Sequence, residues 1–122
     1  MSKVELRPAT AADMAAMLAE PLPYRVRAFA AEKDGELLGV GGFAYLPSGT
    51  VGAFVIMKEG ARRHRLALHK AGVAALAEAR RLKIPRLVAM AEPGVEPAAR
   101  WLRRLGFRET QVDGEQVFVW EA

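Results

Sequence analysis

The densest group of residues able to do chemistry is a basic cluster near the middle of the chain. The segment from Lys58 to Lys70 reads KEGARRHRLALHK and holds five Lys or Arg side chains, with two His among them. An apolar run precedes the cluster and a helical pattern follows it, so the cluster is expected at a helix start, where the first N–H groups lack partners. Such N–H groups beside cationic side chains favour phosphate or another anion. The alternatives are a solvated basic surface and nucleic acid, and nucleic acid is disfavoured because no recognition-helix motif is present.

Few other residues could take part in catalysis or bind a metal. The chain has no Cys, which excludes a thiol nucleophile and a thiolate metal site. His64 and His69 are five residues apart rather than the four that place two ligands on one helix face, so no metal site is predicted. Ser48 has no His or acid in a triad-like context. Glu92, directly after an apolar run, is the best-placed candidate for a general base. The remaining candidates for that role are Glu59, Tyr24 and Tyr45.

Hydrophobic periodicity predicts the elements that must position these residues. Strands are expected at residues 3–9, 24–34, 36–46, 51–57, 84–90, 107–112 and 115–121, and helices at 10–20, 61–82 and 97–105. The segment 51–57 is apolar throughout, which is typical of a strand buried on both faces. The succession of this strand, a long helix and a further strand predicts a βαβ crossover. The expected fold is α/β in a mixed form: a mostly antiparallel sheet of six to seven strands flanked by three helices.

Short local signals fix several of the element ends. Thr10 and Asp13 have the spacing of a capping box at the start of the first helix. Asp34-Gly35 and Asp113-Gly114 each predict a hairpin turn, because both central residues of the favoured turn need positive φ. The long helix is expected to bury one apolar stripe, comprising Leu66, Val73, Leu76 and Ala77.

Three segments, in this order, resemble the GNAT superfamily of N-acetyltransferases over essentially the whole chain. AFAAEKDGELLGVGGFA, residues 28–44, looks like the family's second and third strands around their turn. GARRHRLALHKAGVAALAEARRLKI, residues 60–84, occupies the place of the R/Q-x-x-G-x-G/A loop and its helix. AARWLRRLGFRET, residues 98–110, looks like the late helix that ends in LGF. Short GNAT-like proteins of tailed phages look similar as well.

The resemblance implies a site for acetyl-CoA at the crossover. The pantetheine arm is expected between the strand ending in Val55, Ile56 and Met57 and the strand at 87–91. An amine acceptor would meet the acetyl group in the same space between the two strands, and the pyrophosphate is expected at the loop that follows the first strand. The loop positions implied in this way are Arg62, Arg63, His64, Arg65, Leu66 and Ala67.

The chain departs from the family pattern at three places. Arg65 or Leu66 replaces the first loop glycine, depending on whether the motif starts at Arg62 or Arg63. Leu102 and Val95 stand where many members have a Tyr acid and an Asn. Only residues 10–25 separate the first two strands, where the family commonly fits two helices that shape the acceptor pocket.

Composition bounds the remaining expectations. A chain of 122 residues, 52% hydrophobic and 26% charged, is expected to form a single globular domain over residues 1–122. Residues 1–57 carry five Lys or Arg against six acids, and residues 58–122 carry thirteen against eight, so the basic character belongs to the second half.

Two hypotheses of different class follow from these observations. The first is an N-acetyltransferase that moves the acetyl group of acetyl-CoA to a primary amine, located in the cytoplasm. The second is a catalytically inactive GNAT-fold protein with a structural role in a virion, and it is supported by the departures just described. Besides acetyl-CoA and the acceptor, a second copy of the chain or other virion proteins stay open as partners. No membrane association is expected.

Overall fold

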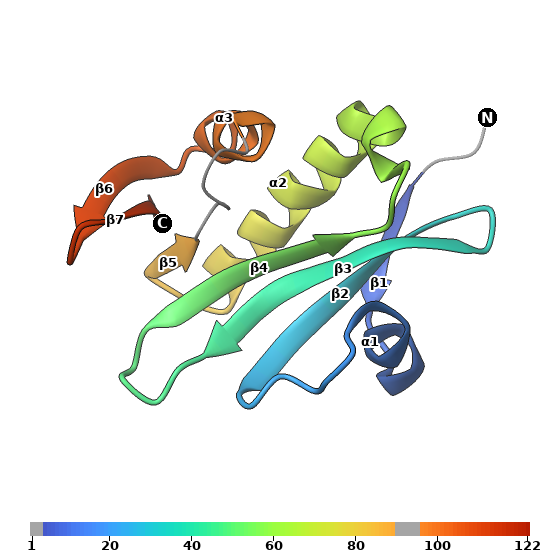
Figure 1. Ribbon diagram of the computed structural model, residues 1–122, viewed down its shortest axis with the longest axis horizontal. Coiled ribbons are helices and arrows are strands. Elements are labelled where there is room, and N and C mark those ends of the chain that lie inside the picture. Colours follow the sequence, from blue (N-terminus) through green and yellow to red (C-terminus); the bar gives the residue numbers. More distant parts are fainter. Residues whose placement is uncertain (1–3, 90–95) are drawn as a thin grey trace.

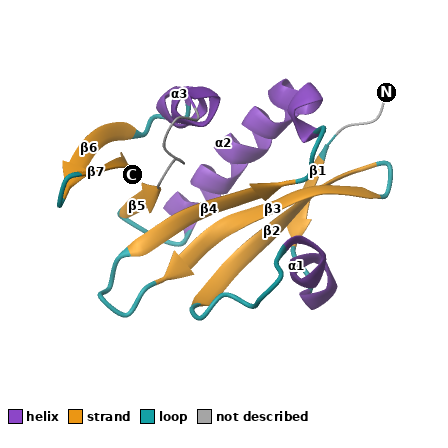
Figure 2. Ribbon diagram, viewed as in Figure 1, coloured by secondary structure: helices purple, strands orange, loops and turns teal. Residues whose placement is uncertain are grey.

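A computed structural model of the chain describes residues 4–89 and 96–122. Figures 1 and 2 show its strands and helices. The elements of the first half are β1 (Glu5–Pro8), α1 (Ala11–Met17), β2 (Arg25–Lys33), β3 (Glu36–Tyr45) and β4 (Val51–Met57). Those of the second half are a 3₁₀ turn (Ala61–His64), α2 (Arg65–Arg81), β5 (Arg86–Ala89), α3 (Glu96–Arg104), β6 (Arg108–Val112) and β7 (Glu115–Glu121).

The seven strands form one mixed sheet in the order β1-β2-β3-β4-β5-β7-β6. Every adjacent pair is antiparallel except β4 and β5, which are parallel and joined through α2. The predicted fold class and the βαβ crossover are therefore confirmed. This crossover places the basic segment directly after the carboxyl end of β4 (Figure 1).

The main core lies between the sheet and the layer formed by α2 and α3. Its fully buried side chains include Phe43 from β3, Leu87 from β5 and Phe118 from β7. From α2, Leu76 and Ala79 pack into the same cluster. The core thus draws on both halves of the sheet, so α2 and α3 hold the halves together from one side.

The opposite face of the sheet carries α1, which an ion-pair cluster fixes in place. Arg7 of β1 reaches Asp13 of α1 at 2.6 Å and Glu32 of β2 at 3.1 Å. Asp13 also accepts from the backbone N–H of Thr10, whose hydroxyl accepts from the N–H of Asp13 in return. The predicted capping box is confirmed. The Arg7 guanidinium and these hydrogen bonds hold the pKa of the Asp13 carboxyl well below its usual range.

Both Asp-Gly turns are confirmed. Asp34 and Asp113 have φ of 52°, and the glycine after each has φ of 80°. Gly106, at the end of α3, has φ of 99°, as a left-handed helix terminus requires. Local turn chemistry therefore fixes the ends of several elements.

The predicted apolar stripe of α2 is wrong at most of its positions. Leu66 is 72% exposed and Val73 51%, while Leu76 is buried as expected. Small residues take the buried positions instead: Ala79 is fully buried, and a Cβ on Gly72 would lie 3.1 Å from the Leu105 side chain of α3. The physical reason is that α3 approaches α2 closely, which small residues allow and an apolar stripe would prevent.

We predict that Asp13→Asn destabilises the fold in a manner that depends on pH. The folded pKa of Asp13 lies below its unfolded value, so its contribution is present above an unfolded pKa near 3.8 and is lost as the pH falls. The melting temperature of the variant should therefore lie well below that of the wild type at pH 7, and the gap should narrow towards pH 3. Thermal melts followed by circular dichroism at both pH values measure this.

The matched control is Glu5→Gln, which neutralises an exposed acid on neighbouring β1. It should leave the melting temperature nearly unchanged at both pH values. A constant gap for Asp13→Asn across the pH range would show that the carboxylate charge does not hold α1.

Candidate functional site

Among the described residues, strands β4 and β5 pair at one point. Between the described residues of the two strands, the ladder has one register pair, Gly52 with Val88. On its other side β4 pairs with β3 along its whole length, from Val51 to Met57. Figure 1 shows β5 beside the start of β4, while β4 runs on towards α2. The described part of β5 ends at Ala89, so no described residue of β5 lies opposite β4 beyond Ala53. This stretch of β4 is where the resemblance predicts room for the pantetheine arm, and we refer to it as the opening.

The hydrogen bonds between β3 and β4 reveal which backbone groups of β4 face β3. At one end of their register the Lys58 N–H donates to the Leu38 carbonyl over 2.8 Å, and at the other the Leu46 N–H donates to the Thr50 carbonyl over 3.0 Å. In an antiparallel ladder every second pair of residues exchanges both bonds. The residues of β4 that direct their N–H and C=O towards β3 are therefore Gly52, Phe54 and Ile56.

Two glycines on β3 agree with this assignment. A Cβ on Gly39 would stand 2.6 Å from the carbonyl oxygen of Ile56, and one on Gly41 would stand 2.8 Å from that of Phe54. Both oxygens therefore lie against β3. Since the contacted atoms are backbone, a larger residue at either glycine would push the two strands apart.

Val55 and Met57 consequently direct their N–H and C=O towards the opening. No described residue of β5 pairs with either of them. Unpaired peptide groups in such a position are available to an extended ligand that carries its own amides. This edge of β4 therefore offers hydrogen bonds to such a ligand.

The side chains of the same two residues are exposed on the face that carries α2. Val55 is 51% exposed and Met57 38%. Ile56, between them, is half-buried on the opposite face. The prediction that this strand is buried on both faces is therefore wrong: none of the seven residues of β4 is buried, and Val55 and Met57 are exposed with no partner among the described residues of β5.

The chain after β4 forms a tight turn that begins the helical segment. Gly60 has φ of 84°, and the Ala61 N–H donates to the Lys58 carbonyl over 3.1 Å. Ala61 is buried with Leu38 and Ala31, which anchors the turn to the sheet. Sequence reasoning missed this anchor, although a lone small apolar residue within a charged run was the available signal.

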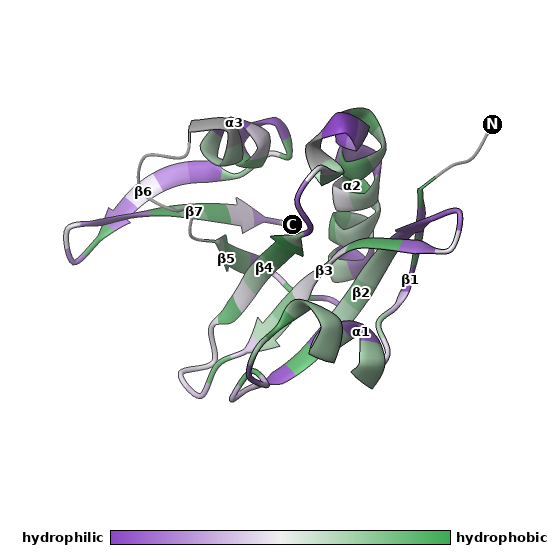
Figure 3. Ribbon diagram, turned by 45° about the vertical axis from the view of Figure 1, so that its right-hand side comes forward, coloured by the Kyte–Doolittle hydropathy of each residue, from purple (hydrophilic) through white to green (hydrophobic). Residues whose placement is uncertain are grey.

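The start of α2 has the features of an anion site. His64 precedes the helix without capping it through its side chain, and no acid lies in the first turn. Within the described part of the chain, Arg63 and Arg65 are exposed and form no ion pair. Figure 3 shows the hydrophobic end of β4 followed at once by a hydrophilic loop. Positive charge is thus concentrated beside the opening.

The other predicted residues are placed as follows. Leu66 is exposed in the first turn of α2, and Ala67 is partly buried beside it. Arg62 belongs to the 3₁₀ turn, and its side chain lies outside the described residues, as does Glu92. The loop motif starts at Arg62 or at Arg63, and both residues belong to the 3₁₀ turn. From either start the motif extends into the first turn of α2.

Two kinds of feature are absent from the part of the chain that the structure describes. No group of three His, Asp or Glu side chains there could hold a metal ion. No helix there has the length and apolar character that crossing a membrane requires.

Solved structures with the same fold are acetyltransferases. An acetyltransferase from Agrobacterium tumefaciens strain C58 matches with a TM-score of 0.76 and 22% identity, over 98% of this chain and 91% of that one. YncA from Salmonella typhimurium, solved with its cofactor acetyl-CoA, matches with a TM-score of 0.76 and 18% identity, over 98% and 94%. The GNAT domain of PAT from S. lividans gives 0.74 and 14%, over 98% and 90%. No protein-family model and no curated protein matches the sequence.

The chain therefore has the GNAT fold. Among GNAT acetyltransferases of known structure it matches several along nearly their whole length. The resemblance first noted in three sequence segments is confirmed at the level of the fold.

We predict that amide exchange will reveal the alternation along β4. The N–H groups of Phe54 and Ile56 bond to β3 and should exchange slowly with deuterium, whereas those of Val55 and Met57 should exchange much faster. The reason is that exchange requires a broken hydrogen bond, and no described residue of the sheet accepts from the second pair. Two-dimensional ¹H–¹⁵N NMR of the free protein in D₂O measures all four residues in one experiment. Equal protection at all four would mean that the edge of β4 is closed.

Proposed function

We propose that this protein is an N-acetyltransferase that transfers the acetyl group of acetyl-CoA to a primary amine. The observation that carries the proposal is the edge of β4, where the peptide groups of Val55 and Met57 face away from β3 and have no partner among the described residues of β5. The exposed cations at the start of α2 support it, since they suit the phosphates of the same ligand. The GNAT fold adds support, because YncA, which shares it, was solved with acetyl-CoA.

Each part of the proposed site has a task set by its chemistry. Acetyl-CoA supplies an activated thioester, which an unprotonated amine can attack directly. The peptide groups of Val55 and Met57 hold an extended arm in the opening, and an N–H at this edge can stabilise the negative charge that develops on the carbonyl oxygen. Arg63 and Arg65 bind phosphate at the mouth. The lost proton of the amine needs a base, and Glu92 is our candidate on sequence grounds.

The alternative function is a GNAT-fold protein without catalysis. Leu102 stands where many family members have a Tyr. Its side chain cannot donate a proton to the departing thiolate, and this favours the inactive alternative. The two hypotheses differ in one measurement: release of free CoA from acetyl-CoA in the presence of a panel of primary amines. Binding of acetyl-CoA without any release for any amine would support the inactive alternative.

We predict that the double variant Arg63→Ala, Arg65→Ala binds acetyl-CoA at least about tenfold more weakly than the wild type. A hydrogen bond to a charged group contributes roughly 1.5–3 kcal/mol, and about 1.4 kcal/mol is a factor of ten in Kd. Isothermal titration calorimetry measures the effect.

The control for this prediction is Arg100→Ala, which removes an exposed arginine of α3 away from the loop. It should bind as the wild type does. An unchanged Kd in the double variant would reject the phosphate assignment. An absence of binding by the wild type at millimolar acetyl-CoA would reject the proposed function itself.

We further predict opposite outcomes for proline at two adjacent positions of β4. Val55→Pro removes an N–H that faces the opening, so the protein should fold and yet lose acetyl-CoA binding or turnover. Ile56→Pro removes an N–H that bonds to β3 and should cost about 1–3 kcal/mol of stability. Circular dichroism melts followed by calorimetry with acetyl-CoA separate the two effects. Full binding and turnover in a folded Val55→Pro variant would exclude that N–H from the site.

A further inference from the structure

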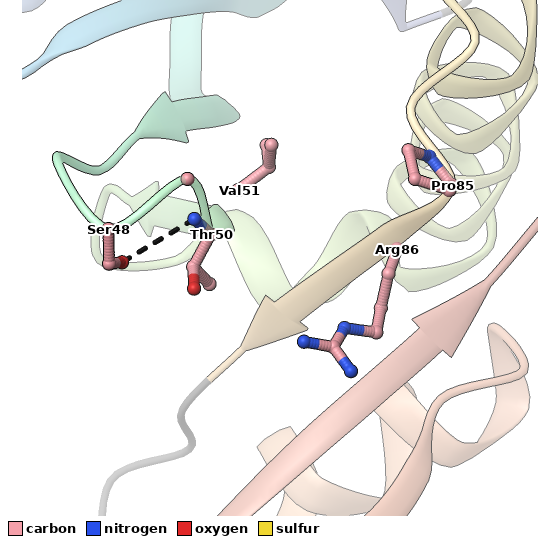
Figure 4. Close-up of a pocket in the computed structure, with 6 residues that line it drawn as sticks. Ser48, Thr50, Val51, Pro85 and Arg86 are labelled. Carbon is pink, nitrogen blue, oxygen red and sulfur yellow. Dashed lines mark hydrogen bonds between the residues drawn. The ribbon is translucent and has the colours of Figure 1, made fainter.

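A second hollow lies at the other end of the β4–β5 junction. It has a volume of about 340 Å³ and is lined by the β3–β4 turn on one side and the start of β5 on the other. Figure 4 shows Ser48 and Thr50 on the turn and Arg86 on β5. The remaining lining residues are Gly49, Val51 and Pro85.

This pocket is separate from the proposed acetyl-CoA site. Its lining residues on β4 and β5 come before the single pair of Gly52 and Val88, whereas the opening begins after that pair. A strand rises about 3.3 Å per residue, so Val51 and Val55 are roughly 13 Å apart along β4. The ladder pair stands between the two sites.

The turn that forms one wall is held by its own backbone. The Leu46 N–H donates to the Thr50 carbonyl and the Gly49 N–H donates to the Leu46 carbonyl, each over 3.0 Å. Gly49 has φ of 88°, a left-handed conformation that glycine adopts without strain. The Ser48 hydroxyl accepts from the Thr50 N–H at 3.4 Å, which leaves its own proton free to donate. Two hydroxyl groups are therefore presented from a rigid support.

The opposite wall supplies a positive charge. The Pro85 carbonyl accepts from the Ala122 N–H over 3.0 Å, and Arg86 is in register with Glu121 of β7, so the backbone at this point is fixed. The Glu121 carboxylate binds Arg108 at 2.6 Å. No ion pair of Arg86 occurs within residues 4–89 and 96–122, and none of the six lining residues is acidic. The pocket thus combines a guanidinium with hydroxyl donors and no competing carboxylate in its wall.

We propose that this pocket binds a small oxyanion, a phosphate or carboxylate group, between Arg86 and the hydroxyls of Ser48 and Thr50. A guanidinium pairs with either group through two parallel hydrogen bonds, and the hydroxyls donate to the remaining oxygens. Because the ligand joins the β3–β4 turn to β5, it links the two strands next to the ladder pair that Gly52 forms with Val88. The site is an anion-binding site additional to the proposed phosphate loop at the start of α2.

The test is an NMR titration of the ¹⁵N-labelled protein with inorganic phosphate and, separately, with acetate. It is carried out in the Arg63→Ala, Arg65→Ala background, so that the loop at the start of α2 contributes little. The amides of residues 48–51 and of Arg86 should shift and saturate, and the anion with the lower Kd identifies the preferred group. Adding Arg86→Gln should raise the Kd at least about tenfold, while Arg100→Gln, on the exposed side of α3, should leave it unchanged.

Two results would overturn the proposal. One is saturation with the same Kd after Arg86→Gln, and the other is an absence of shifts at residues 48–51 for both anions. Ser48→Ala provides a second variant, since it removes a donor from an exposed turn and should weaken binding without affecting the fold. The outcome is independent of acetyl-CoA, because neither the background nor the readout requires the acetyltransferase site.

Discussion

The single ladder pair between β4 and β5 is the constraint on which the rest of the structure depends. A sheet of seven strands is ordinarily continuous through its hydrogen bonds, yet among residues 4–89 and 96–122 one register pair, Gly52 with Val88, joins its two halves. The halves must therefore be held by other means. The core between the sheet and the α2–α3 layer does this, since it contains Phe43 from one half and Leu87 and Phe118 from the other. Burial of apolar area replaces hydrogen bonds at the point where the strands separate.

This arrangement explains why α2 places small residues at its contacts with the core and with α3. Gly72 of α2 faces Leu105 and Trp101 of α3, and Ala79 is fully buried beneath them. Close approach of α2 and α3 brings both helices onto the β5 and β7 side of the core. Arg80 of α2 accordingly lies over the Trp120 ring of β7, 5.1 Å from its centre. The two helices thus pack on the second half of the sheet, while the edge of β4 at Val55 and Met57 has no partner among the described residues of β5.

The sequence predicted those features that are determined locally. Both Asp-Gly turns, the capping box of Thr10 and the end of α3 at Gly106 depend on the chemistry of a few adjacent residues. The buried face of α2 was not predictable in this way: in a helix rich in alanine, an apolar period describes several faces equally well. The exposure of Val55 and Met57 was hidden for a related reason. An apolar strand has the same sequence pattern whether or not a neighbouring strand lies beside it along its whole length. Its exposure depends on the pairing with β5, which the sequence does not show.

The location of the free edge also explains how a single chain can tolerate it. An unpaired edge at the border of a sheet is a template for pairing with another chain, and proteins commonly block it. The edge at Val55 and Met57 lies in the interior of the sheet instead, with β5 and β7 beyond it. A whole strand cannot enter a space that is closed at Gly52 and Val88, but a thin extended molecule with spaced amides can. The peptide groups that have no partner among the described residues therefore suit a ligand that could pair with them, and this supports our proposal that the acyl donor binds there.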